Sequence, residues 1–248
     1  MRIMVLNQTP ANPRDSEYHQ RVEPILRSYA SPGTQVDLCY PDESPGRAQG
    51  GGAAHLGYYL SVPGLVQKAV WAEQNGYDAV IQSNNFEPGV EASRLAVRIP
   101  VLGLCRTTIL AAANLTDRIG VTVPLDGYMV LARQLLESYG LLRFVTEIRS
   151  MSLGGVPNGD QVAAQRPAIA ARAAEVMRAL VQETGAECIV PLGGAIIPYI
   201  VDPKDLEPEV GAPVLNPKAI GIHFAEMCVH LGMSQSPLTY PLATLGGG

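Results

Sequence analysis

The stretch GYDAVIQSNNFEPG, residues 76–89, decides the fold. Its apolar part, Asp78–Gln82, has the length of a buried strand, and a serine, two asparagines and a carboxylate follow within five residues. A strand that is apolar along its length is typical of a parallel sheet covered on both faces. In such sheets, ligands bind beyond the carboxyl ends of the strands. The stretch therefore predicts an α/β protein with polar groups gathered at a strand end.

Similar short apolar runs occur on both sides of this stretch. The expected strands are Arg2–Leu6, Gln35–Cys39, Asp78–Gln82, Val101–Leu104, Arg118–Val123, Phe144–Ile148, Glu187–Leu192 and Pro213–Leu215. Helical patterns lie between them, at Leu65–Asn75, Gly127–Tyr139, Ala163–Glu183 and Ala219–Leu231. Strands that alternate with helices form right-handed βαβ units.

The strands divide into four and four, which predicts two pseudo-symmetric lobes. Each lobe is expected to hold a four-stranded, mainly parallel sheet flanked by helices, with the active site in the inter-lobe cleft where the strand ends meet. Lobe 1 would comprise residues 1–104 and 217–248, and lobe 2 residues 105–216.

Composition limits the partners. A chain of 248 residues with 47% hydrophobic and 17% charged residues is typical of a compact globule with a substantial core. The net charge of −5 gives no basic footprint for nucleic acid. With no apolar run of eighteen residues and no signal-type stretch, we expect no membrane partner. Four widely spaced cysteines without a CxxC pair indicate a reducing, cytoplasmic location.

Motifs for metals and cofactors are absent from the sequence. The four histidines show no HExxH or HxH spacing, so no metal site is expected. The glycine-rich stretches have neither the P-loop Lys-Ser/Thr nor a GxGxxG after a strand, and no GxSxG occurs. The sequence therefore predicts a cofactor-free site for a small-molecule substrate.

The residues after Gln82 are the first candidates for that site. Asn84 and Asn85 offer amide donors and acceptors, and a helix starting near Pro88 would add N–H groups suited to a carboxylate or an enolate oxygen. Glu87 would lie in the first turn of that helix as a candidate acid or base. The alternatives are an Asx turn for the asparagines and a helix-dipole role for Glu87.

Two other helix starts carry candidates. Cys105, beside Arg106, would have a lowered pKa and a reactive thiol, unless it is only a small packed residue. Arg106 would clamp a carboxylate, or lie on the surface. Lys218 is electrostatically unfavourable at a helix N-terminus, which indicates that it serves the cleft. The remaining candidate binding residues lie at or beside strand ends: Asn7, Gln8, Phe86, Thr107, Thr122, Gly193, Gly194 and Asn216.

Several motifs, taken in order, resemble the hydantoin racemase branch of the aspartate/glutamate racemase superfamily. They are Met1–Asn7, Gly76–Ile81, Phe86–Gly89, Ile99–Gly103 and Pro191–Gly194. Arylmalonate decarboxylase and maleate isomerase belong to the same superfamily. The resemblance implies two pseudo-symmetric α/β lobes with the active site between them, and a homo-oligomer.

The resemblance also shows what the sequence lacks. In the family's racemases, one cysteine thiolate removes a proton from a carbon acid and a second thiol returns it on the opposite face. The two positions resemble Asn84 and Gly194, and neither is a cysteine. Racemisation by two thiols at these positions is therefore not expected, and Cys105, Glu87 or Lys218 would have to handle the proton.

The expected function is that of a metal-independent enzyme acting on a small carbonyl, carboxylate or cyclic amide compound. Isomerase or lyase chemistry through an enolate-like intermediate needs one acid or base and a pocket of preorganised donors. Three alternatives stay open: a hydrolase of a small ring amide, a hydantoin-type racemase with differently placed cysteines, and a non-catalytic ligand-binding homologue.

Overall fold

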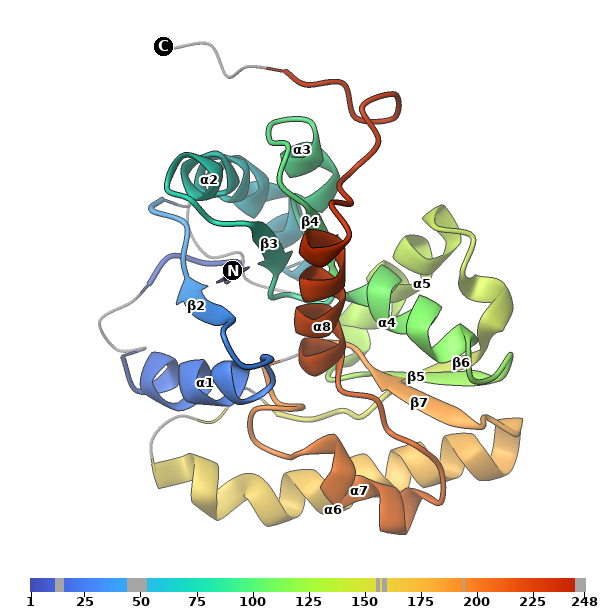
Figure 1. Cartoon of the computed structure of the whole chain (residues 1–248). Coiled ribbons are helices and arrows are strands. Elements are labelled where there is room, and N and C mark those ends of the chain that lie inside the picture. The colour runs from blue at the N-terminus through green and yellow to red at the C-terminus, as the bar shows by residue number, and fades with distance from the viewer. Residues whose placement is uncertain (12–15, 44–52, 155–156, 158–159, 194, 244–248) are drawn as a thin grey trace. The chain divides into compact units, whose positions relative to one another are not determined.

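The computed structural model describes residues 1–11, 16–43, 53–154, 157, 160–193 and 195–243 (Figure 1). The chain divides into two compact units. Unit 1 comprises Met1–Leu104 and Gly221–Gly248, and unit 2 comprises Cys105–Ile220. The α/β class that the sequence predicts is confirmed, because each unit contains a parallel sheet flanked by helices.

Unit 1 contains a four-stranded parallel sheet in the order β2-β1-β3-β4. Its strands are β1 (Arg2–Leu6), β2 (Gln35–Cys39), β3 (Ala79–Gln82) and β4 (Val101–Gly103). Its helices are α1 (Ser16–Ser28), α2 (Ala53–Gln74), α3 (Val90–Arg94) and most of α8 (Pro217–His230). The central strand β3 is buried at every residue, which explains why its sequence is a continuous apolar run.

Different helices cover the two faces of this sheet. Val80 packs in an apolar cluster with Leu65 of α2. Its neighbour Ile81 points to the opposite face, where α8 approaches closely at Gly221. A methyl group on Gly221 would overlap the side chain of Leu104. The small residue lets α8 lie close to the sheet.

β4 is an edge strand of the described sheet, and the side chains of Gln235 and of Arg94 on α3 supply partners for its backbone. The Val101 N–H donates to Gln235 Oε1 (3.3 Å), and the Val101 carbonyl accepts a hydrogen bond from Arg94 Nε (3.0 Å). Gln235 Nε2 donates to the carbonyl oxygens of Val97 (2.7 Å) and Ile99 (2.9 Å). Side chains thus satisfy backbone groups that no further strand pairs with.

Unit 2 contains a three-stranded parallel sheet in the order β6-β5-β7. Its strands are β5 (Ile119–Val123), β6 (Val145–Ser150) and β7 (Cys188–Pro191). Its helices are α4 (Leu104–Ala113, from its second residue), α5 (Met129–Ser138), α6 (Asp160–Thr184) and α7 (Pro203–Val210), with 3-10 turns at Asp126–Tyr128 and Leu142–Phe144. An apolar cluster joins Met177 of α6, Leu206 of α7 and Ile189 of β7.

The segment Pro213–Leu215, expected as a fourth strand of this sheet, forms a single parallel bridge between Val214 and Ile189. Ile189 donates its N–H to the Pro213 carbonyl and accepts from the Leu215 N–H, both at 2.9 Å. The Val214 N–H donates instead to Glu207 Oε1 (3.1 Å). The segment is too short for a longer ladder, because α8 begins only three residues after Val214.

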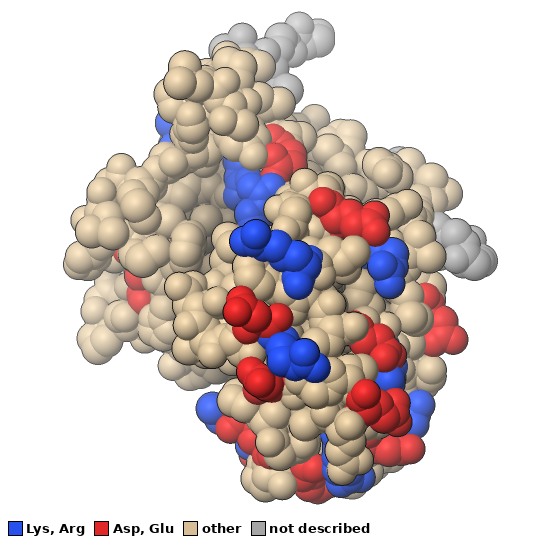
Figure 2. Space-filling view, turned by 90° about the vertical axis from the view of Figure 1, so that its right-hand side faces the viewer, with Lys and Arg blue, Asp and Glu red and all other residues tan. Residues whose placement is uncertain are grey.

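Acidic and basic side chains are intermingled on the face of the molecule in Figure 2. Neighbouring charges of opposite sign weaken each other's field at a distance, so this face does not favour a polyanionic partner. Among the described residues, no helix combines the length and the apolar character that a membrane crossing requires.

Glu226 of α8 ties this helix to the turn between α1 and β2, and it predicts a pH dependence of stability. Its carboxylate accepts hydrogen bonds from Ser31 N, Ser31 Oγ and His223 Nδ1, each at 2.8 Å. Burial opposes the charge, but these bonds and one from Thr34 outweigh it and lower the pKa of Glu226 to about 2.

Because the pKa is lowered relative to the unfolded chain, the stabilisation is present above about pH 4.5 and is lost as the pH falls towards 2. We expect Glu226→Gln to lower the free energy of unfolding by up to about 3 kcal/mol at pH 7 and by almost nothing near pH 2. Urea unfolding across this range measures the difference. Glu17→Gln, at an exposed position on α1, is the matched control. If Glu226→Gln lowers the free energy of unfolding equally at both pH values, the ionisation of Glu226 is not what stabilises the fold.

Candidate functional site

In unit 1, side chains at the ends of β1 and β3 bind one another. Asn84 Nδ2 donates to Gln8 Oε1 in a short hydrogen bond, and Asn84 Oδ1 accepts from the Phe86 N–H at 2.9 Å. Gln8 Nε2 donates to the Gly57 carbonyl (3.1 Å) and to Ser61 Oγ (3.3 Å), both on α2. Asn84 therefore forms the Asx turn considered for it, and it also joins two strand ends to a helix.

Glu87 lies outside the helix in which the sequence places it. Helix α3 begins at Val90 and has Gly89, with a φ of 75°, as its N-cap. Glu87 itself has a φ of 62°, a left-handed conformation that is uncommon for a residue with a Cβ. The prediction of a first-turn carboxylate was wrong because a second positive φ at Gly89 delays the helix, and Glu91 occupies the first turn instead.

The buried Glu87 carboxylate lies directly against Gly103, the last residue of β4. A methyl group on Gly103 would overlap the carboxylate, so the missing side chain provides the space that the acid fills. The acid also acts on Tyr58 of α2. Burial raises the pKa of the Tyr58 hydroxyl, and the nearby charge of Glu87 raises it further.

The other unit 1 candidates are held by the backbone and the core. Asn7 donates its N–H to the Cys39 carbonyl (2.8 Å), which extends the pairing of β1 with β2 by one residue. Asn85 and Phe86 are buried, and Phe86 is among the largest side chains with almost no exposure. Phe86 thus belongs to the buried core just after the end of β3.

In unit 2, Lys218 and Tyr199 face each other. Lys218 is 1% exposed, and its Nζ lies 5.5 Å from the centre of the Tyr199 ring. Burial lowers the pKa of Lys218 to about 7, because a charged amine is poorly solvated inside a protein. Asn216 fixes the backbone at this point, since its Oδ1 accepts from the N–H groups of Lys218 (3.0 Å) and Ala219 (3.1 Å). The amine thus enters the buried region from a capped helix start.

The ends of β5 and β7 lie side by side. The Leu192 N–H donates to the Thr122 carbonyl at 2.8 Å, which places the start of the Gly193 loop next to β5. Thr122 Oγ1 is buried and has no hydrogen-bond partner among the described residues. Gly193 has a φ of 89°, which allows the chain to turn sharply after β7. Gly194 lies outside the described residues.

The three candidates on α4 are all at its first turn. Cys105 is completely buried, and Thr107 is buried as well. The Arg106 guanidinium lies over the Tyr139 ring, 3.9 Å from its centre, in a cation–π contact. Stacking of this kind fixes the plane of the guanidinium.

Sequence reasoning missed Tyr199, Tyr58 and Ser61. Tyr199 follows a cis Ile197–Pro198 bond, and only its position shortly after the Gly193 loop connects it with a strand end. Ser61 lies on α2, 53 residues from its partner Gln8. Tyr58 lies on the same helix near Glu87. No local pattern in the sequence indicates either pairing. Among the described residues, no cluster of acids, histidines and cysteines is suited to hold a metal ion.

A family model described as Asp/Glu/Hydantoin racemase matches residues 16–225. The chain belongs to this family. The hydantoin racemase of Pseudomonas sp. strain NS671 is 30% identical over 217 residues, which are 88% of this chain and 83% of that protein. The hydantoin racemase of Rhizobium meliloti is 26% identical over 219 residues, 87% and 86% of the two chains.

Solved structures of two allantoin racemases share the fold. The allantoin racemase from Pseudomonas fluorescens aligns with a TM-score of 0.84 at 22% identity and covers 100% of this chain and 99% of its own. The allantoin racemase from Klebsiella pneumoniae aligns with a TM-score of 0.82 at 22% identity, covering 100% and 96%. The resemblance to racemases that the sequence motifs indicate is confirmed, and the family supports an enzyme of the isomerase kind.

Proposed function

We propose that this protein is an isomerase that removes and returns a proton at the carbon next to a carbonyl in a small cyclic amide of the hydantoin type. Family membership and the relatives named hydantoin racemase support the reaction class. The hydrogen at such a carbon is acidic because the resulting enolate is stabilised by the neighbouring carbonyl. The enzyme must then supply a base and donors for the enolate oxygen.

The observation that carries the proposal is Lys218. At the usual lysine pKa of about 10.4, almost every amine is protonated near pH 7 and cannot act as a base. Burial lowers the pKa of Lys218 to about 7, so a substantial fraction is neutral at that pH. A base with a pKa near the working pH is well matched to proton transfer. By the resemblance of the motifs, Asn84 and Gly194 take the place of the two cysteines of the family's racemases, and we propose that Lys218 has the role of one of those thiols.

The other candidates complete this assignment as proposals. We propose Glu87 and Cys105 as further proton-transfer groups. Both side chains are buried. The Glu87 carboxylate lies against Gly103, the last residue of β4, and Cys105 follows β4 closely in the sequence. Enolate oxygens and ring N–H groups would be bound by amides, hydroxyls and backbone N–H groups. We propose Asn7, Gln8, Asn84, Asn85, Phe86, Arg106, Thr107, Thr122, Gly193, Gly194 and Asn216 as substrate-binding residues.

The test is hydrogen exchange in D₂O. One enantiomer of 5-benzylhydantoin is incubated with and without the protein, and NMR and chiral chromatography follow the C5 hydrogen and the configuration. We expect enzyme-dependent deuteration at C5 with loss of optical purity. Ring opening to the N-carbamoyl acid would indicate a hydrolase instead. If neither exchange nor ring opening occurs with hydantoins or with allantoin, the proposal is overturned.

We further propose a cytoplasmic homo-oligomer. All four cysteines are free thiols, which suits a reducing compartment. Size-exclusion chromatography with light scattering measures the oligomeric state directly.

A further inference from the structure

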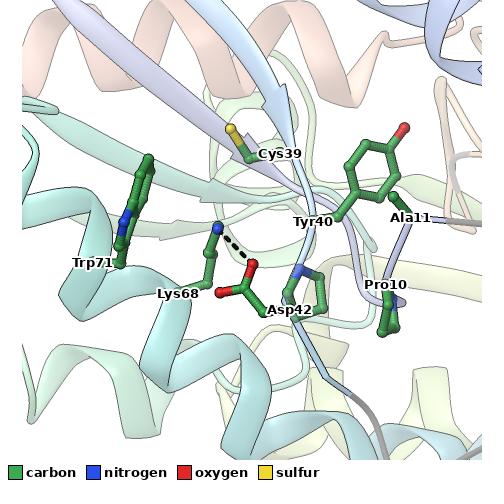
Figure 3. A pocket seen from close by; sticks show the side chains of 8 residues that line it. Pro10, Ala11, Cys39, Tyr40, Asp42, Lys68 and Trp71 are labelled. Carbon is green, nitrogen blue, oxygen red and sulfur yellow. Dashed lines mark hydrogen bonds and ion pairs between the residues drawn. The ribbon is translucent and has the colours of Figure 1, made fainter.

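Unit 1 contains a hollow of about 360 Å³ between the end of β1, the end of β2 and helix α2 (Figure 3). Pro10, Pro41 and Trp71 give it apolar walls, and Lys68 and Asp42 give it charge. A volume of this size matches the lower end of small-molecule sites, which combine apolar walls with a few placed polar groups. None of these residues belongs to the proposed catalytic or substrate-binding set.

The two charges of the hollow differ in how firmly they are held. Lys68 Nζ lies 4.3 Å from the centre of the Trp71 ring and 2.9 Å from Asp42 Oδ1. The Lys68 side chain is 13% exposed, whereas that of Asp42 is 78% exposed. An ion pair with such an exposed partner contributes little stability, so Asp42 can return to water at small cost. The ammonium is therefore the fixed charge, and its acidic partner is replaceable.

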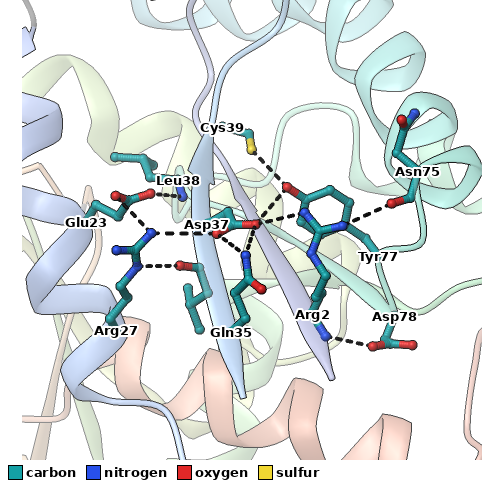
Figure 4. Close-up of polar contacts among 11 residues, drawn as sticks. Arg2, Glu23, Arg27, Gln35, Asp37, Leu38, Cys39, Asn75, Tyr77 and Asp78 are labelled. Carbon is teal, nitrogen blue, oxygen red and sulfur yellow. Dashed lines mark hydrogen bonds and ion pairs between the residues drawn. The ribbon is translucent and has the colours of Figure 1, made fainter. Parts of the chain in front are cut away.

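Cys39, which also lines the hollow, does not compete for this ammonium. Burial raises the pKa of its thiol, so the thiol is neutral near pH 7. Its Sγ lies 3.7 Å from the Tyr77 hydroxyl, which donates to Asp37 Oδ2 at 2.9 Å. Arg2 donates to the same oxygen at 3.2 Å, and its guanidinium lies over the Tyr77 ring (Figure 4). This network joins residues of β1 and β2 with Tyr77 behind the wall that Cys39 forms.

We propose that this hollow binds a small aromatic carboxylate. The aromatic ring packs against Trp71 and the prolines, and the carboxylate takes the place of Asp42 on Lys68 as a charge-assisted hydrogen bond. The site is independent of the proposed reaction, and its ligand need not be a substrate.

Trp71 is the single tryptophan of the chain, so its emission reports on this hollow alone. We titrate the protein with benzoate, exciting at about 295 nm to avoid the tyrosines, at constant ionic strength. Benzyl alcohol and benzylamine serve as neutral and cationic probes of similar shape, and acetate as a carboxylate without a ring. We expect a saturable change with benzoate. Benzyl alcohol and benzylamine should bind at least about tenfold more weakly, since tenfold corresponds to one hydrogen bond to a charged group. Acetate should also bind more weakly, because it keeps the carboxylate but lacks the ring that packs against Trp71.

Two variants act in opposite directions if the proposal holds. Lys68→Met should weaken benzoate binding about tenfold and leave benzyl alcohol unchanged, while Asp42→Asn should tighten benzoate binding by removing its competitor. Lys204→Met, at an exposed lysine of unit 2, is the matched control. A benzoate affinity equal to that of benzyl alcohol, or one that Lys68→Met leaves unchanged, would overturn the proposal. The readout does not depend on catalysis, so failure here and failure of the proposed isomerase are distinguishable.

Discussion

Lys218→Met is expected to reduce kcat for C5 deuterium exchange by about 10²–10⁴-fold, the usual contribution of a positioned base. Methionine has nearly the length of lysine and fills the same buried space without a titrating group. Because burial lowers the pKa of Lys218 to about 7, the wild-type rate should fall about tenfold per pH unit below 7, as the amine is protonated, and level off above it. Stopped reactions analysed by NMR between pH 5 and 9 measure both effects.

Lys218→Arg separates a base from an anion-binding charge. A guanidinium remains protonated, so the variant should be as slow as Lys218→Met if the amine must accept a proton. If Lys218 only held an anionic oxygen, arginine would restore much of the rate with a flat pH profile, and our assignment would be wrong. Lys204→Met, with a side chain 77% exposed on α7, should retain full activity. Circular dichroism of each variant shows whether the fold is intact.

Gly103→Ala is expected to lower the free energy of unfolding by about 3 kcal/mol, because the added methyl group would overlap the buried Glu87 carboxylate. The acid has little room to withdraw, since it is buried and its backbone is in a left-handed conformation. Urea unfolding at pH 7 gives the free energy of unfolding of the wild type and of the variant from the midpoint and slope of each transition.

Two controls show whether the clash is the cause. Gly57→Ala places the same methyl group in α2, where the described residues have no other atom within 4 Å of it, so it should leave the stability unchanged or raise it by about 0.5–1 kcal/mol. In a Glu87→Ala background, Gly103→Ala should cost less than about 1 kcal/mol. If Gly103→Ala is equally costly with and without Glu87, the carboxylate is not what requires the glycine.

The buried strands were predictable because their signal is local. Strands β1 and β2 have the bounds that the sequence predicts. Strand β5 is one residue shorter than predicted at its start, and β7 is one residue shorter at each end. The helices were harder to predict from the sequence. Helix α2 begins twelve residues before the expected Leu65, since Gly57, Pro63 and Gly64 conceal a helix that packing against the sheet stabilises. Helix α1 was not predicted, and it contains Pro24.

The candidate site was predictable as a set of strand ends but not as a set of contacts. Gln8 and Asn84 were identified separately, whereas their mutual hydrogen bond joins residues 76 positions apart. The position of Lys218 indicated a special role from electrostatics alone, yet its partner Tyr199 depends on the path of the chain after β7. Pairings of this kind depend on tertiary packing, which no sequence period encodes.

The amide of Gln235 has a consequence for solubility. An edge strand with unpaired N–H and C=O groups is a template on which another chain can add a strand. Here a single side chain occupies the Val101 N–H and two nearby carbonyls, and so acts as a cap for the sheet. A chain shortened before Gln235 would keep the sheet but expose that template. The C-terminal segment thus protects the molecule from intermolecular β-pairing, the first step towards aggregation.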